Sequence, residues 1–100
     1  MSDLRVDHQP ARERYEAFLD EDGTEKSIGY VDYMTEPNTM LLTHTVVHEQ
    51  FGGRGFAGQL VKYVLDDARA NGQQIVPVCS YIQSYVTKHP EYADLVRAQD

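Results

Sequence analysis

The sequence predicts an α/β fold of the α+β kind, in which an antiparallel β-meander is followed by a β-α-β-α unit. Residues 14–47 contain segments rich in strand-forming residues with short turns between them. From Phe56 onward the apolar residues recur at helical spacing. A short apolar run and a second helical stripe then complete the chain. Its 100 residues have the length of a single domain, 1–100.

The N-terminal half supplies the expected meander. Residues 1–11 are polar and include a proline, so we expect a loose lead-in there. Residues 14–19, 27–34 and 40–47 are the expected strands. The turn at 20–23 offers Gly23 for a positive φ. Because these strands are joined by short loops, we expect them to be antiparallel neighbours.

The C-terminal half supplies the expected β-α-β-α order. A helix is expected from Phe56 to the stop signal Asn71-Gly72. Residues 75–79 form a short apolar run, which a right-handed crossover places parallel to the strand at 40–47. Ser80 with Gln83 matches a capping box that begins a second helix. A proline at 90 ends that helix, and residues 91–96 are expected to form a further helical turn.

A glycine-rich run, Gln50 to Ala57, lies at the junction between the third strand and the first helix. Gly52, Gly53 and Gly55 free the backbone from the limits that Cβ imposes. Several N–H groups can then point into one concavity at a helix N-terminus, which suits a phosphate or pyrophosphate. Arg54 either adds a charge-assisted bond to that anion or is a solvated loop residue. The alternative for the whole run is a tight turn that binds no ligand.

Composition and charge exclude several classes of function. A net charge of −7 argues against general binding of nucleic acid or of an anionic membrane surface. No apolar run reaches the ~20 residues that span a bilayer, and no signal peptide is evident, so a cytoplasmic location is expected. The single cysteine, Cys79, cannot form an internal disulfide. The histidines match no zinc spacing with it, and we expect no metal.

The order of elements and the loop together resemble a known family. Gln50, Gly53 and Gly55 fill a Q-x-x-G-x-G turn between a strand and a helix. His44-Thr45-Val46-Val47 precedes it, and Cys79-Ser80-Tyr81-Ile82 and Tyr85 follow the last strand. This pattern, over roughly residues 15–96, resembles the GNAT superfamily of N-acetyltransferases, and within it a family of minimal GNAT-like proteins of about 100 residues. The resemblance implies a GNAT-like fold, acetyl-CoA or coenzyme A as the ligand, and an amine as the acceptor.

The resemblance also implies a set of cofactor-binding positions. Backbone N–H groups of the loop bind the pyrophosphate, and a bulge near Val46 to His48 polarises the thioester carbonyl. The residues implied to bind the cofactor are Val46, Val47, Gln50, Gly52, Gly53, Arg54, Gly55, Phe56, Ala57, Ser80 and Tyr85.

Two residues are candidates for catalysis. His44, expected on the same strand face as Leu42 and Val46, either takes the proton of an ammonium acceptor or is an ordinary half-buried histidine. Cys79 either accepts the acetyl group as a thiolate favoured by the helix N-terminus or is a small buried apolar residue. In the predicted sheet the two lie on neighbouring strands, so a contact between them is possible.

Two functions remain open at this point. The first is transfer of acetyl from acetyl-CoA to a small amine or a protein amino group. The second is binding of coenzyme A without catalysis, as a sensor or partner protein. Larger GNAT enzymes have a helical pair between their first strands that helps to form the acceptor site, and only a few residues stand there in this chain. They also often use a tyrosine as general acid, and Tyr85 and Tyr92 are the candidates. The sequence indicates neither the acceptor nor the oligomeric state.

Overall fold

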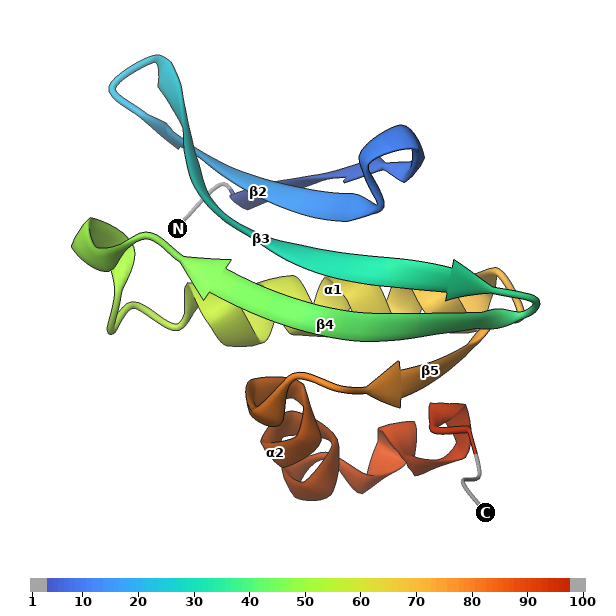
Figure 1. Ribbon diagram of the computed structural model, residues 1–100. Coiled ribbons are helices and arrows are strands. Elements are labelled where there is room, and N and C mark those ends of the chain that lie inside the picture. The colour runs from blue at the N-terminus through green and yellow to red at the C-terminus, as the bar shows by residue number, and fades with distance from the viewer. Residues whose placement is uncertain (1–3, 98–100) are drawn as a thin grey trace.

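The computed structural model describes residues 4–97 as a five-stranded sheet with helices packed against it (Figure 1). The strand order is β1-β2-β3-β4-β5. The first four strands are antiparallel neighbours, and β5 runs parallel to β4. The elements are β1 (Leu4–Gln9), β2 (Arg14–Glu21), β3 (Thr24–Glu36), β4 (Thr39–Val47), α1 (Phe56–Ala70), β5 (Gln74–Pro77) and α2 (Ser80–Lys88), with 3-10 helices at Pro10–Arg12, Glu49–Phe51 and Pro90–Leu95.

This architecture confirms the predicted meander followed by a β-α-β-α unit. The β2–β3 hairpin is longer than expected, and Asp22 and Gly23 form its tip with φ values of 53° and 77°. The predicted stop of α1 is also confirmed. Asn71 caps the helix, and Gly72 follows with a φ of 68°, donating its N–H to the carbonyl of Arg69. The turn predicted at 91–96 is the 3-10 helix Pro90–Leu95.

The expectation of a loose lead-in over residues 1–11 is wrong where the structure describes it. Residues 4–9 form β1, which pairs antiparallel with β2. Its inward residues Leu4, Val6 and His8 lie opposite Leu19, Ala17 and Tyr15. The His8 and Tyr15 rings stack with centroids 4.0 Å apart, which ties the strand to the core. Only three inward positions stand among polar neighbours, so the sequence signal for this strand is weak. Residues 1–3 lie outside the described part.

The hydrophobic core lies between one face of the sheet and α1, which runs behind the sheet in Figure 1. It buries alternate residues of β2, β3 and β4 and the apolar stripe of α1. The tyrosine hydroxyls at its edge are satisfied, since Tyr15 donates to Asp67 at 2.6 Å and Tyr33 bonds His8 at 2.7 Å. The core members from α1 are Phe56, Leu60, Val61, Val64, Leu65 and Ala68.

A bulge in β4 reverses which side chains face the core. Asp32 pairs with His44, whereas the next residue of β3, Tyr33, pairs with Leu42, so Thr43 is an extra residue. Met40 and Leu42 are buried before the bulge, and His44 after it is exposed. The predicted common face of Leu42 and His44 is therefore wrong. An uninterrupted strand would have placed them together, but the extra residue shifts the alternation by one.

The predicted capping box at Ser80 does not form. Cys79, in an extended conformation with φ −69° and ψ 131°, is the N-cap, and no side chain caps α2. Gln83 donates its backbone N–H to the carbonyl of Cys79 at 3.0 Å. Its side-chain amide donates to the carbonyl of Val78 at 3.3 Å, whereas in a capping box the side chain accepts the N–H of the N-cap residue. The helix thus includes Ser80 in its first turn, one residue earlier than the box requires.

Candidate functional site

The site begins where β4 and β5 part. Their parallel pairing covers Thr39–Leu42 with Gln74–Pro77, and the N–H of Cys79 bonds the carbonyl of Leu42 at 2.9 Å. The chain then turns into α2, while β4 continues to Val47. Within residues 4–97, no strand pairs with this edge of β4 beyond Leu42. The end of β4 therefore offers backbone groups on one side, next to the N-termini of both helices.

The glycine loop adopts a conformation that depends on two of its glycines. Gly53 and Gly55 have φ values of 77° and 80°, which other residues rarely adopt. Among the described residues, none accepts a hydrogen bond from the N–H groups of Gly53, Arg54 or Gly55. The first N–H groups of α1 are open for the usual reason that no helical carbonyl precedes them. Apart from the adjacent residues, no atom lies within 4 Å of a Cβ built at either glycine, so the space beside both is open.

Three of the predicted loop residues are less available to a bound anion than expected. Gly52 has an ordinary φ of −67° and donates its N–H to the carbonyl of Glu49 at 3.0 Å. Its expected role as a cradle donor is therefore wrong. Gln50 lies exposed in the 3-10 helix that precedes the loop. Arg54 stacks on the Phe56 ring at 4.9 Å and lies 3.6 Å from a carboxylate oxygen of Glu21. An anion in the cradle must compete with Glu21 for it.

The remaining loop and strand positions can contribute through the backbone. Phe56 is buried, with 3% of the residue exposed, so its ring belongs to the core and only its backbone is left for a ligand. Ala57 is half-buried in the first turn of α1. Val46 and Val47 are half-buried at the end of β4, and Val47 packs against the core.

Cys79 lies at the junction between β5 and α2 with its thiol half-buried. The sulfur is 3.6 Å from the Thr45 hydroxyl across the gap between the strands. Burial alone raises the pKa of the Cys79 thiol. Hydrogen bonds from the Thr45 hydroxyl and from the N–H groups of Ile82 and Tyr81 outweigh it, so the pKa is lowered overall. The helix N-terminus thus favours the thiolate, as predicted from its position in the sequence.

His44 does not share this environment. Thr45 faces Cys79, and neighbouring residues of a strand point to opposite faces, so His44 lies on the other face of β4. Its side chain is exposed, and its Nδ1 lies 3.2 Å from the Thr43 hydroxyl. The structure therefore does not bring His44 and Cys79 into contact.

The bulge implied near Val46 to His48 lies elsewhere. The register shift falls at Thr43, whose hydroxyl donates to the carbonyl of Asp32 at 3.2 Å. The N–H of His48 already bonds the carbonyl of Ile28 at 2.8 Å. The interrupted part of β4 is therefore beside Cys79 and Thr45 rather than beside the glycine loop.

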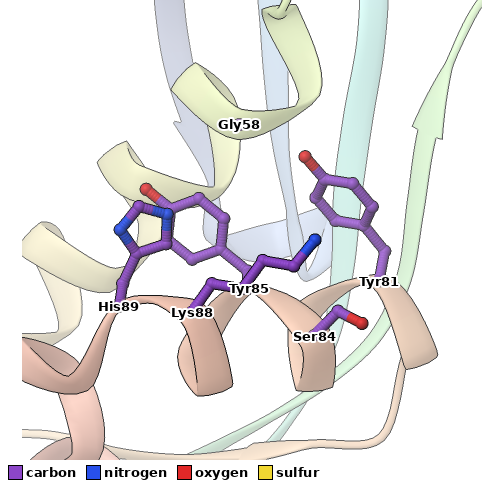
Figure 2. A pocket seen from close by; sticks show the side chains of 6 residues that line it. All are labelled: Gly58, Tyr81, Ser84, Tyr85, Lys88 and His89. Carbon is purple, nitrogen blue, oxygen red and sulfur yellow. The ribbon is translucent and has the colours of Figure 1, made fainter.

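A pocket between α1 and α2 extends the site, and the sequence did not predict most of its lining. Its volume is about 270 Å³. Figure 2 shows two tyrosine rings of α2 on either side of it, with Gly58 of α1 opposite. A Cβ at Gly58 would lie 3.7 Å from the Tyr81 hydroxyl, so any larger side chain there would enter the pocket. The lining residues are Gly58, Tyr81, Ser84, Tyr85, Lys88 and His89.

A signal for this pocket was present in the sequence. Gly58 follows the loop in a helical turn where glycine is unfavourable, which indicates a close approach. Tyr81, Ser84, Tyr85 and Lys88 recur at the three- and four-residue spacing of one helix face. Of the residues predicted in α2, Tyr85 lines the pocket, whereas Ser80 does not.

Of the two candidate acids, Tyr85 lines the pocket. Its ring stacks on His89 with centroids 4.1 Å apart, and burial raises its pKa, which keeps the hydroxyl protonated. Tyr92 is buried and donates its hydroxyl to Asp66 at 2.7 Å, away from the pocket.

Two further kinds of feature are absent from the described part of the chain. Residues 4–97 contain no group of three or more histidine, cysteine or acidic side chains that could hold a metal ion. None of the helices within the same range is long and apolar enough to cross a membrane.

Known proteins are similar to this chain in sequence and in fold. Residues 14–95 match the family model of the GCN5-related N-acetyl-transferases. Protein NATD1 of Xenopus tropicalis is 31% identical over 98 residues, which cover 98% of this chain and 88% of that protein. Protein NATD1 of Danio rerio is 30% identical over 95 residues, covering 93% and 84%. A GCN5-like protein of Staphylococcus aureus, solved by NMR, has a TM-score of 0.70 at 24% identity and covers 100% of this chain and 94% of its own; it shows the fold.

The fold thus defines a GNAT-like protein with a mixed sheet and a parallel β4–β5 pair. The chain belongs to the family of GCN5-related N-acetyltransferases. Members of this family use acetyl-CoA as cosubstrate.

Proposed function

We propose that this protein transfers an acetyl group from acetyl-CoA to an amine. The observation that carries the proposal is the coincidence of three features at one end of the sheet. The open N–H groups of Gly53 and Gly55 lie at the N-terminus of α1. The edge of β4 is unpaired beyond Leu42 within the described chain. A cysteine with a lowered pKa stands where β4 and β5 part.

The loop and helix α1 supply the site for the pyrophosphate. The N–H groups of the loop donate to the phosphate oxygens. The positive end of the α1 dipole stabilises the bound anion by a further ~0.3–1 kcal/mol at an exposed site. The pantetheine arm then extends along the unpaired edge of β4 toward Cys79. The loop follows the C-terminal end of β4, whereas Cys79 bonds Leu42 nearer the middle of that strand. An arm that leads from the loop to Cys79 must therefore run back along β4.

Cys79 is the nucleophile in the proposed covalent route. Its thiolate attacks the thioester carbonyl, a carbon–sulfur bond to Cys79 forms, and the thiolate of coenzyme A leaves. An unprotonated amine next attacks the acetyl group on Cys79, and the cysteine thiolate is released. The proton that the amine nitrogen loses in this step passes to water, and the released thiolate of coenzyme A takes up one proton in turn. The Cys79 thiol donates to the Thr45 hydroxyl at 3.6 Å, and once the thiol has lost its proton the same hydroxyl donates to the thiolate and holds it in position.

His44 has no part in the proposed route, because it lies on the face of β4 opposite to Cys79. It stands exposed on the outer face of β4, one residue from Thr45. The net charge of −7 favours a cationic acceptor over an anionic one.

Substitution of the cysteine tests the covalent route. With acetyl-CoA and no amine, we expect wild-type protein to gain one acetyl group on Cys79, and Cys79→Ala to gain none. We also expect Cys79→Ala to lose at least about 100-fold in release of free coenzyme A with an amine library, because a missing nucleophile removes both steps. Intact-mass spectrometry and thiol release measure the two effects.

The same assay separates the alternatives. Unchanged turnover in Cys79→Ala means that the amine attacks acetyl-CoA directly. Binding of coenzyme A to the wild type without turnover on any amine supports a binding protein. Excess coenzyme A that leaves the melting temperature unchanged contradicts both functions, since a ligand at 100 times its Kd adds about 2.7 kcal/mol.

The pH dependence of Cys79 alkylation tests its environment. Because the pKa of the thiol is lowered, we expect half-maximal alkylation by iodoacetamide at a lower pH than for a free cysteine. Thr45→Val removes a hydrogen bond that favours the thiolate, so it should move the midpoint to higher pH. A midpoint that does not move in Thr45→Val contradicts the role of the hydroxyl.

A further inference from the structure

Lys88 is exceptional among the basic residues of this chain. The sequence has nine lysines and arginines, and all nine lie within the described residues. The other eight each place a side-chain nitrogen within 4.0 Å of a carboxylate oxygen. Lys88 forms no such pair within residues 4–97. An uncompensated cation in so acidic a protein is positioned to receive an anion.

The position of Lys88 indicates what that anion belongs to. Lys88 lines the pocket between α1 and α2, and Figure 2 shows its ammonium group extending between Tyr85 and Tyr81. Gly58, on the opposite wall, is the third residue of α1 and follows directly on the cradle. A ligand with its pyrophosphate in the cradle can therefore reach this pocket with its nucleoside end.

The walls of the pocket suit a purine carrying an additional phosphate. Tyr81 and Tyr85 offer aromatic faces, on which a base can stack. Lys88 offers a point charge with three donors, which suits a phosphate monoester. Coenzyme A carries such a group at the 3′ position of its ribose. In a protein of net charge −7, this group needs a local cation to offset the general repulsion.

We propose that Lys88 recognises the 3′-phosphate and makes the protein selective for coenzyme A over its 3′-dephosphorylated form. This inference rests on the proposed function, because it takes the cradle to hold the pyrophosphate of the same molecule. Lys88, on α2, thus selects the nucleotide and takes no part in acetyl transfer.

Calorimetric titration with coenzyme A and with 3′-dephospho-coenzyme A tests the proposal without any need for turnover. We expect wild-type protein to bind coenzyme A at least about fivefold more tightly, as one charge-assisted contact at a partly exposed site provides. Lys88→Gln should bring the ratio of the two affinities close to one while binding of the dephosphorylated form stays unchanged. Lys88→Arg should restore most of the ratio.

Lys62→Gln is the matched control. It removes the same charge from the facing helix, where Lys62 is engaged with Asp66 at 2.8 Å. The ratio should stay at its wild-type value. An equal loss in Lys62→Gln assigns the effect to the general field and overturns the role of Lys88.

The possible failures are distinguishable. Equal binding of the two ligands by the wild type overturns this inference and leaves the proposed function intact. A ratio of the two affinities that stays at its wild-type value in Lys88→Gln also overturns this inference and leaves the proposed function intact. No binding of either ligand by correctly folded wild-type protein overturns both.

Discussion

Replacing Gly55 by valine is expected to weaken coenzyme A binding by at least about tenfold. Gly55 has a φ of 80°, and a β-branched residue in such a conformation costs about 1–3 kcal/mol. The loop can escape this strain only by rotating the peptide units whose N–H groups form the cradle. Isothermal titration with coenzyme A measures the loss.

Gly72→Val provides the control for this experiment. Gly72 has a similar φ of 68° and, like Gly55, no atom within 4 Å of a Cβ built on it, but it stands at the opposite end of α1. We expect both variants to lose a similar amount of stability, and only Gly55→Val to lose affinity. Equal affinity in the two variants means that the loop does not bind the pyrophosphate.

Replacing Gly29 by alanine is expected to have the largest effect on stability, at least about 3 kcal/mol. Gly29 is buried in β3 opposite Val47. A Cβ there would lie 2.1 Å from the carbonyl oxygen of Val46 and 2.9 Å from the Cα of Val47. Both are backbone atoms, so β3 and β4 must move apart. Urea unfolding followed by circular dichroism measures the change.

Lys26→Ala is the matched change on the same strand. Lys26 is exposed, and we expect its replacement to alter the free energy of unfolding by no more than about 0.5 kcal/mol. A loss below about 1 kcal/mol in Gly29→Ala contradicts the close approach of the two strands. Because Val46 and Val47 form the end of β4, a partly folded Gly29→Ala should also bind coenzyme A more weakly.

The fold could be predicted because local signals and topology agree. The change from strand to helix spacing at Phe56 marks the crossover, and the handedness rule then fixes β5 as parallel to β4. Strand β1 was missed because three inward residues among polar neighbours give little periodicity. The bulge at Thr43 was missed because it depends on how β3 and β4 pair, and no residue type marks it. That one residue reversed the expected orientation of His44.

The candidate site was predictable where the backbone conformation restricts the residue type. Gly53 and Gly55 have a positive φ, which glycine adopts readily and other residues rarely do, so the residue type itself marks both positions in the sequence. The environment of Cys79 followed from its place before a helix, although its partner Thr45 did not. The pocket was largely missed, because its two walls come from α1 and α2 and meet only in the folded protein. Likewise, the absence of an ion pair at Lys88 within the described chain becomes visible only when the partners of the other basic residues are known.

The unpaired edge of β4 has a consequence for how the protein associates with itself. The five residues Thr43–Val47 present a sheet edge that another extended chain can join, and such edges are templates for aggregation. Among the described residues, the interruption at Thr43 and the contact of Cys79 with Thr45 limit access to it. A ligand arm lying along this edge would shield it, so the segment that we propose guides the substrate is also one through which an empty protein is open to intermolecular β-pairing.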